Sequence, residues 1–337
     1  MISGKGPLIA VRNSISRMDS IYLSNWSRYD ENTHSRYISY MVDFMWDDGI
    51  KFNSDLRNPY MRSIIQWALS SVKKVGIFIG GSLPIDVIEL LLGNPSFTKL
   101  ELDGCDFSTL QLLTEFKKFD YIRASSRILE SLNNVRIVTK KLEFVGVCLK
   151  DILKLRSIKT NLLITSYSNF CLNDSLLTVD VGPGFQFLEK LELTVQDERI
   201  LSDSEKFLKF LESLNTKLDK LELLKFTFHK HDSYLTYNRD QELFNALCDS
   251  LKNLEDFEGK MIVYEGRVKV ELNCSISSVI SCSKQVFESY CETLKKEFQS
   301  FEHPSCLTAE RSYHGFNKSR NVTKNFEVNT QLRLSFI

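Results

Sequence analysis

The sequence lacks an excess of either charge sign, because its 43 basic residues are balanced by 43 acidic ones. Electrostatic binding to nucleic acid or to an anionic membrane needs a basic surface, so neither is expected as a partner. The sequence also has no apolar run of 18 or more residues, and residues 1–10 lack the basic and apolar regions of a signal peptide. We therefore expect no membrane association and a cytoplasmic or nuclear location.

Sequence motifs of catalysis and metal binding are absent as well. The eight cysteines occur without a CxxC pair, which excludes a zinc ribbon or a thioredoxin-like site and indicates buried free thiols. There is no GxSxG, P-loop or HExxH pattern. His229 and His231 would share one face of a strand, but Asp232 is their only acidic neighbour, so a solvated loop is favoured over a metal site. No catalytic residue, metal or cofactor is expected.

Two glycine-rich segments have simple structural explanations. The segment 76–81 lacks both the GxGxxG spacing and the lysine of a phosphate loop, and phosphate binding at the helix after Pro84 is left as a minor alternative. Gly182, Pro183 and Gly184 are residues that permit a tight turn before a strand.

A short recurring phrase is the most informative feature of the sequence. Residues 97–102, 188–193 and 218–223 read FTKLEL, LEKLEL and LDKLEL, and residues 141–144 give a shortened KLEF. The apolar-x-x-apolar-x-apolar spacing is that of a leucine-rich repeat strand, in which alternate residues point into the core. With 43% hydrophobic and 26% charged residues, the chain is expected to fold around a packed core.

Weaker strand candidates at 75–79, 121–124 and 162–164 fill the gaps between these phrases. We take seven residues as equivalent positions, which gives separations of 23, 22, 20, 21, 28 and 30 residues: Ile77, Leu100, Ile122, Leu142, Leu163, Leu191 and Leu221. These steps are close to the leucine-rich period of roughly 20–29 residues.

Helix signals lie between the strand candidates. Pro84 precedes an apolar run that ends at Gly93, and Ser108 with Gln111 and Ser202 with Glu205 have the spacing of capping boxes. Strand, helix and strand in alternation predict a parallel sheet with helices on one side. The predicted fold is therefore α/β, an irregular leucine-rich-repeat-like solenoid.

Three regions are expected. Residues 1–72, with clustered aromatics and a helix at 62–72, are interpreted as an N-terminal helical cap, and residues 73–258 as the repeat region. Residues 259–337 are expected to form a β-rich appendage with a hairpin at 261–272, a polar loop at 303–325 and a final strand at 331–336 that returns to the hairpin.

In the strand phrase the leucines face the core, so the residues between them should line the open face of the sheet. With Ile122 in register, Arg123 would lie between Glu101 and Glu143 and give a cross-strand ladder of alternating charge. These residues are either solvated ion pairs or part of a protein-binding surface on the concave side of a solenoid. The candidate binding residues are Lys99, Glu101, Arg123, Lys141, Glu143, Lys190, Glu192, Lys220 and Glu222.

Residues 72–258, with their KLEL-like strands at 97–107, 141–155 and 187–224, resemble the leucine-rich F-box-associated regions of nematode F-box proteins. That resemblance implies a substrate-recruiting surface, in a family whose separate F-box docks onto the Skp1 subunit of a ubiquitin ligase. Residues 1–60 depart from the family because they contain no LPxE-like opening or Leu-rich F-box run. The sequence therefore gives no basis for expecting a Skp1-like adaptor as a partner. On this resemblance, the chain would be either a relative that lost its F-box or an incomplete gene product.

The favoured hypothesis is a protein-protein interaction module, with another protein as partner and no turnover; substrate recognition for a ubiquitin-ligase-type adaptor is the narrower version. One alternative is an α/β enzyme in which scattered carboxylates and His229 meet in a pocket. The other is a structural or decaying homologue that has kept no partner.

Overall fold

The computed structural model describes residues 5–30, 35–46, 51–56, 58–168, 179–195, 204–232, 266–280, 306–315 and 326–336. The chain forms two compact units. The first comprises residues 1–145, 155–161 and 182–184, and the second comprises residues 146–154, 162–181 and 185–337. The predicted boundaries at 72/73 and 258/259 stay predictions. The fold is α/β with a mostly parallel sheet, and among the described residues no helix is long and apolar enough to cross a membrane.

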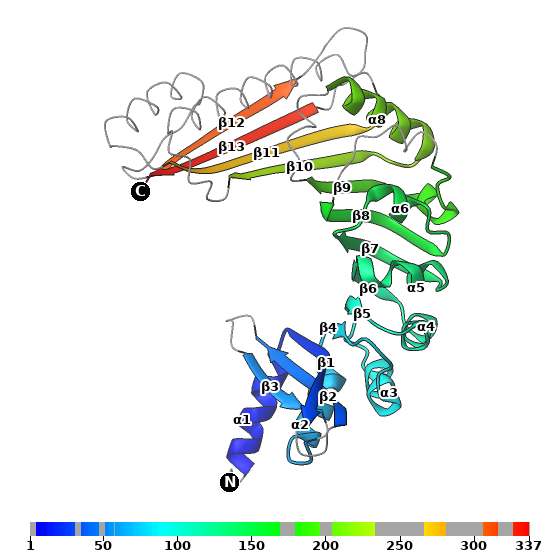
Figure 1. Ribbon diagram of the computed structural model, residues 1–337, viewed down its shortest axis with the longest axis vertical. Helices are drawn as coiled ribbons and strands as arrows, with labels where there is room; N and C mark the ends of the chain where they lie inside the picture. The colour runs from blue at the N-terminus through cyan, green and yellow to red at the C-terminus, as the bar shows by residue number, and fades with distance from the viewer. Residues whose placement is uncertain are drawn as a thin grey trace. The chain divides into compact units, whose positions relative to one another are not determined.

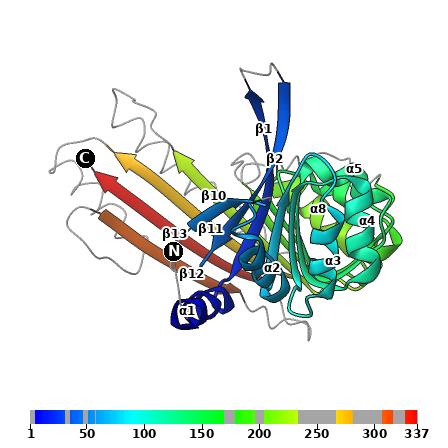
Figure 2. The same cartoon turned by 90° about the horizontal axis from the view of Figure 1, so that it is seen from below.

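The strands of the first unit follow the order β3-β2-β1-β4-β5-β6-β7 (Figure 1). β1, β2 and β3 pair antiparallel, and Figure 2 shows β1 and β2 side by side as a long ribbon. β1 then pairs parallel with β4, and each strand from β4 to β7 is parallel to the next. The bounds are β1 Ser20–Asp30, β2 Ser35–Met45, β3 Lys51–Asp55, β4 Lys74–Phe78, β5 Lys99–Gly104, β6 Phe119–Ser125 and β7 Ile137–Val145.

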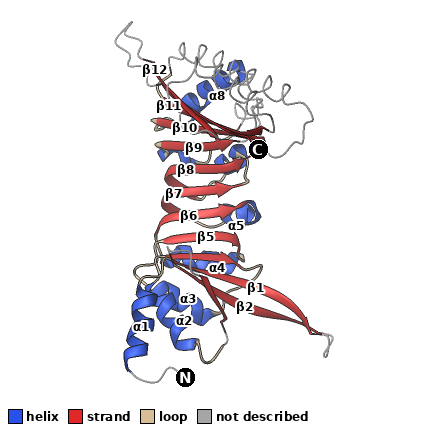
Figure 3. Ribbon diagram, turned by 90° about the vertical axis from the view of Figure 1, so that its left-hand side faces the viewer, coloured by secondary structure: helices blue, strands red, loops and turns tan. Residues whose placement is uncertain are grey.

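Helices connect the parallel strands and cover one face of them, as Figure 3 shows for α4 and α5 behind β5 to β7. The helices of this unit are α1 Lys5–Ser16, α2 Arg62–Ser71, α3 Ile85–Gly93, α4 Phe107–Phe116 and α5 Leu129–Asn133, the last preceded by a 3-10 turn at Ser126–Ile128. The predicted helices at 62–72 and after Pro84 are confirmed. The capping box at Ser108 is wrong, because the N-cap of α4 lies two residues earlier, at Asp106, whose side chain accepts a hydrogen bond from the Thr109 backbone N–H.

The expected N-terminal helical cap is also wrong in its main part. Between α1 and α2 the chain forms β1, β2 and β3, and β1 continues the sheet by pairing with β4. The physical reason is visible in β1, where Ile21 and Leu23 are buried and alternate with Tyr22 and Ser24, the period-two pattern of a strand.

The core of the first unit is a ladder of aliphatic side chains. Val75, Leu100, Ile122 and Leu142 are successive register partners and none is measurably exposed. The predicted equivalence of Leu100, Ile122 and Leu142 is therefore confirmed, whereas Ile77 pairs with Leu102 and lies one inward position further along its strand. The correct partner in β4 is Val75.

A buried polar side chain connects the end of α2 to the turn before β5. The Asn94 side chain is fully buried and donates from Nδ2 to the carbonyl oxygens of Leu69 and Val72, at 2.9 and 2.8 Å, while its Oδ1 accepts from the Ser96 N–H at 2.8 Å. The carbonyls at the end of α2 have no partners within the helix, and Asn94 supplies them. One side chain thus joins α2 to the turn that leads into β5.

Gly182 and Gly184 are required by close packing of the backbone. A Cβ on Gly184 would lie 1.4 Å from the carbonyl oxygen of Ile158, and one on Gly182 would lie 2.0 Å from that of Leu155. The predicted tight turn is present as the 3-10 helix Pro183–Phe187. Glycine at both positions permits this close contact with Leu155 and with Ile158, the first residue of β8 (Ile158–Ser168).

The described strands of the second unit have the order β8-β9-β10-β11-β13-β12, and among them only β12 is antiparallel to its neighbour. Helix α8, at Ser204–Lys217, buries Phe207, Phe210, Leu211 and Leu214, as its sequence pattern predicts. The bounds are α6 Leu149–Leu153, β8 Ile158–Ser168, which begins in the first unit, β9 Lys190–Val195, β10 Leu223–Asp232, β11 Lys269–Ile280, β12 Cys306–Gly315 and β13 Phe326–Phe336.

The C-terminal predictions have mixed outcomes. The final strand does return to pair, since β13 lies parallel to β11. The loop expected at 303–325 is wrong for Cys306–Gly315, which forms β12. The first strand of the expected hairpin, at 261–264, lies outside the described residues, and the described partners of β11 are both parallel to it.

Candidate functional site

The open face of the first unit is the face of β4 to β7 that turns away from the helices (Figure 3). Leu100 and Leu102 are buried on the helix side, so Lys99 and Glu101 take the opposite side of β5. Register then places Lys74, Tyr121 and Lys141 across from Lys99 in one row. A second row holds Tyr22, Gly76, Glu101, Arg123 and Glu143.

The second row contains the predicted ladder of alternating charge. Arg123 lies between two carboxylates, with Nη1 3.6 Å from Glu101 Oε1 and Nε 3.2 Å from Glu143 Oε1. Glu101 also receives Lys74, whose Nζ is 3.0 Å from the same Oε1. The prediction that Arg123 separates Glu101 from Glu143 is confirmed.

Glu101 differs from an ordinary surface carboxylate because only 6% of the residue is exposed. A charge held this far from water is tolerated when cations and hydrogen bonds surround it, and Lys74 and Arg123 supply both. Arg123 is more open and is the part of this network that a partner could reach. The network therefore has a buried anchor and an accessible centre.

Two tyrosines extend the network. The Tyr121 hydroxyl donates to Glu143 Oε2 at 2.7 Å, and Lys74 Nζ donates to the Tyr22 hydroxyl at 3.1 Å. The Tyr22 ring lies across Gly76, where a Cβ would come within 2.2 Å of the ring, and it packs against Phe78 at a centroid distance of 5.6 Å. Glycine at position 76 thus lets an aromatic side chain lie flat on the sheet.

Ionisation follows from these contacts. Burial acts to lower the pKa of Lys74, but hydrogen bonds and charge from Glu101 and Tyr22 outweigh it, so this pKa is raised. Burial and then the hydrogen bond to Glu143 raise the pKa of Tyr121. Lys74 therefore stays charged and Tyr121 stays a neutral donor at physiological pH.

Sequence reasoning missed Lys74, Tyr22 and Tyr121. Lys74 precedes Val75 as Lys99 precedes Leu100, so the correct register of β4 would have placed it in the row. Tyr22 belongs to a strand that the sequence analysis did not expect. The detectable signal was the apolar spacing Met18-x-x-Ile21-x-Leu23, which matches the repeat phrase.

The remaining predicted residues belong to the second unit. Lys190 is exposed at the start of β9, and Glu192 is partly exposed between Ile164 of β8 and Lys225 of β10. Lys225 in turn pairs with Glu271 of β11, so charges alternate along this row too.

Lys220 and Glu222 are not strand residues, and their assignment to the open face is wrong. The sequence LDKLELLKF contains the repeat spacing twice, starting at Leu218 and at Leu221. Leu191 pairs with Leu224 and not with Leu221, so the second spacing is the structural one. The spacing that starts at Leu218 lies in the turn after α8, where the Leu221 N–H donates to the Leu218 carbonyl. Lys225 takes the position proposed for these residues.

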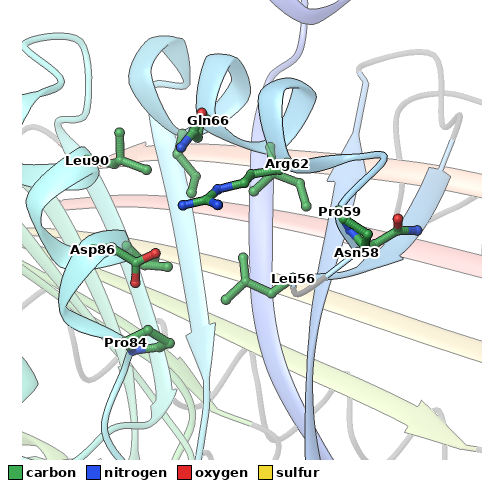
Figure 4. A pocket seen from close by; sticks show the side chains of 11 residues that line it. Leu56, Asn58, Pro59, Arg62, Gln66, Pro84, Asp86 and Leu90 are labelled. Atoms are coloured by element: carbon green, nitrogen blue, oxygen red, sulfur yellow. The ribbon is translucent and has the colours of Figure 1, made fainter.

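The described part of the first unit has hollows in two different places. One, of about 170 Å³, lies on the open face beside the charged row and is lined by Phe78, Glu101, Arg123 and Val145 among others. The other, of about 390 Å³, lies between α2 and α3 (Figure 4). Its lining includes one cation, Arg62, and one carboxylate, Asp86, on an apolar floor, which provides no pair of carboxylates for acid–base chemistry.

No cluster of three or more metal-ligating side chains occurs among the residues that the structure describes. Cys105 and Cys148 are free and only partly buried, and burial raises the pKa of Cys105 to about 12. The side chains of His229 and His231 lie outside the described set, so the enzyme alternative that uses His229 stays a prediction. Comparisons of the chain with protein-family models, curated proteins and solved structures found no match.

Proposed function

We propose that the chain is a protein-interaction module of irregular leucine-rich-repeat type, which binds a partner protein through the open face of β4 to β7. The observation that carries this proposal is the ordered network of Lys74, Glu101, Arg123, Glu143 and Tyr121 on that face. Partly exposed arginine and aromatic side chains held on a sheet have the composition of binding hot spots.

The repeat pattern supports the solenoid part of the proposal. Strands β4 to β7 are parallel, in register at one aliphatic position, and connected by helices on one face. Repeats of this type bury a continuous core and leave the strand face free for partners. Substrate recruitment for a ubiquitin ligase is the narrower form of this function and rests on the resemblance of residues 72–258 alone.

Site-specific photo-crosslinking in cells tests the function. A photoreactive phenylalanine analogue at Lys99, which is exposed on the open face, is compared with the same analogue at Glu115, exposed on α4. We expect discrete protein adducts from position 99 that are absent from position 115. Identical adducts from both positions, or none from position 99, would contradict the proposal.

The adduct then allows a quantitative test. Arg123→Ala should weaken binding of the purified partner by about tenfold, because it removes the accessible centre of the network. Lys140→Ala, a change at an exposed lysine paired with Asp120, is the matched control and should leave affinity unchanged. Mass spectrometry of the same adducts for a Skp1-like adaptor tests the ligase-associated role.

A further inference from the structure

We infer that the polypeptide recognised by the open face of β4 to β7 is an acidic segment that binds across Lys99 and Lys141. This inference rests on the proposed function and adds the chemistry of the partner. It starts from the balance of charges on the two rows described above. Four cations face two carboxylates there, which leaves an excess of two positive charges: Lys74, Lys99, Arg123 and Lys141 against Glu101 and Glu143.

The ion pairs on this face show which two cations have no carboxylate partner among the described residues. Lys74 and Arg123 are engaged by Glu101 and Glu143 at 3.0 to 3.6 Å. In the part of the chain that the structure describes, neither Lys99 nor Lys141 has a carboxylate within ion-pair distance. By contrast, Lys140, next to Lys141 but on the other side of the strand, is 2.9 Å from Asp120.

The two lysines are arranged as a pair around an aromatic ring. Lys99, Tyr121 and Lys141 are consecutive register partners, so the lysine stems begin two strand spacings apart, about 10 Å. The Lys141 Nζ lies over the Tyr121 ring, 5.2 Å from its centroid. Carboxylates at alternate positions of an extended segment are about 7 Å apart, a distance that two flexible lysine side chains can accommodate.

The neighbouring row selects a polypeptide over a nucleic acid. Glu101 and Glu143 lie one row away from the lysines, two residues further along the strands. A nucleic acid strand carries a charge about every 3.4 Å and would bring phosphates against those carboxylates. A polypeptide can place two carboxylates on the lysines and neutral residues over the second row.

Selection from a random dodecapeptide library displayed on phage, with the full chain immobilised, tests the inference. The variant is Lys99→Glu with Lys141→Glu. The matched control is Lys140→Glu with Lys154→Glu, which makes the same change of charge at exposed lysines paired elsewhere. Unchanged circular dichroism and tryptophan fluorescence are required of both before selection.

The expected result is enrichment of peptides with two or more Asp or Glu residues. Synthetic copies should bind the wild type and the control alike in fluorescence anisotropy. They should bind the Lys99/Lys141 variant about tenfold more weakly, and binding should weaken as ionic strength rises.

Three other outcomes overturn the inference, and they separate it from the proposed function. If the selected peptides lack acidic residues but bind Arg123→Ala more weakly, the proposed binding function holds and the inference of an acidic partner is wrong. A single-stranded 12-nucleotide oligomer that binds as tightly as the peptides, and depends on both lysines, would replace the polypeptide with nucleic acid. If no selected peptide responds to any open-face variant, the proposed function and the inference fail together.

Discussion

Replacing Asn94 with leucine should destabilise the first unit by removing the hydrogen bonds of a buried side chain. Asn94 is fully buried, and its side chain makes three hydrogen bonds of 2.8 to 2.9 Å to Leu69, Val72 and Ser96. Leucine has the same number and branching of side-chain heavy atoms as asparagine, with larger methyl groups at the branch, and it can neither donate nor accept a hydrogen bond. The variant therefore leaves the two buried carbonyls and the part-buried Ser96 N–H without these partners.

The magnitude follows from the cost of such groups. A buried hydrogen bond contributes about 0.5–1.5 kcal/mol net, and a donor or acceptor left without a partner costs about 1–3 kcal/mol. Adding this cost for three groups gives an upper limit for the destabilisation, and local relaxation and entry of water reduce it. We expect a loss of about 2–4 kcal/mol in the free energy of unfolding, a large part of the stability of an ordinary domain.

Tryptophan fluorescence during urea unfolding measures this loss. All three tryptophans, at positions 26, 46 and 67, belong to the first unit, so the signal reports that unit alone. Urea slopes are about 1–3 kcal/mol per M, and the midpoint should therefore fall by about 1–2 M.

Asn134→Leu provides the control, because Asn134 is exposed and its side chain makes one hydrogen bond of 3.3 Å, to the Glu130 carbonyl. Its midpoint should stay within about 0.3 M of the wild type. An Asn94→Leu midpoint equal to that of Asn134→Leu would refute the view that Asn94 ties α2 to β5.

Three further changes test other parts of the structure. Gly184→Ala should lower the free energy of unfolding by about 2–4 kcal/mol, because the new Cβ would collide with the Ile158 carbonyl. Gly93→Ala is the control, since its Cβ would meet no atom within 4 Å and the change should be neutral or stabilising. Equal urea midpoints for the two variants would be inconsistent with this packing. Thr165→Val should raise the stability of the second unit by about 1 kcal/mol in calorimetry, because the Thr165 hydroxyl is buried with no hydrogen-bond partner in the described structure. A lower transition temperature for the variant would show that the hydroxyl has a partner. Burial acts to raise the pKa of Asp106, but hydrogen bonds from Ser108, Thr109 and Ser82 outweigh burial, and the pKa is lowered below 3.8. The charged carboxylate therefore stabilises the fold at pH values above the pKa of the unfolded state, and this stabilisation is lost as pH falls through the pKa of the folded state. The stability difference between wild type and Asp106→Asn should therefore shrink between about pH 5 and pH 2 in urea titrations, and a difference independent of pH would exclude the linkage.

Much of the charged ladder could be predicted because it depends on local pattern and on one assumption of register. Once Leu100, Ile122 and Leu142 are aligned, strand alternation puts Glu101, Arg123 and Glu143 in one row. The same logic fails where the pattern is degenerate. At 218–226 two overlapping copies of the spacing compete, and local sequence does not distinguish them.

The sequence by itself determined the α/β class, the direction of the central strands and the inward aliphatic positions of β5, β6 and β7, because these follow from short-range periodicity and connection length. Tertiary structure alone decided that β10 starts at Leu223, that β1 joins the sheet beside β4, and that Lys74 neutralises Glu101. Each of those depends on pairing between segments distant along the chain. Such pairing is set by the total burial of many side chains, which no single phrase of sequence contains.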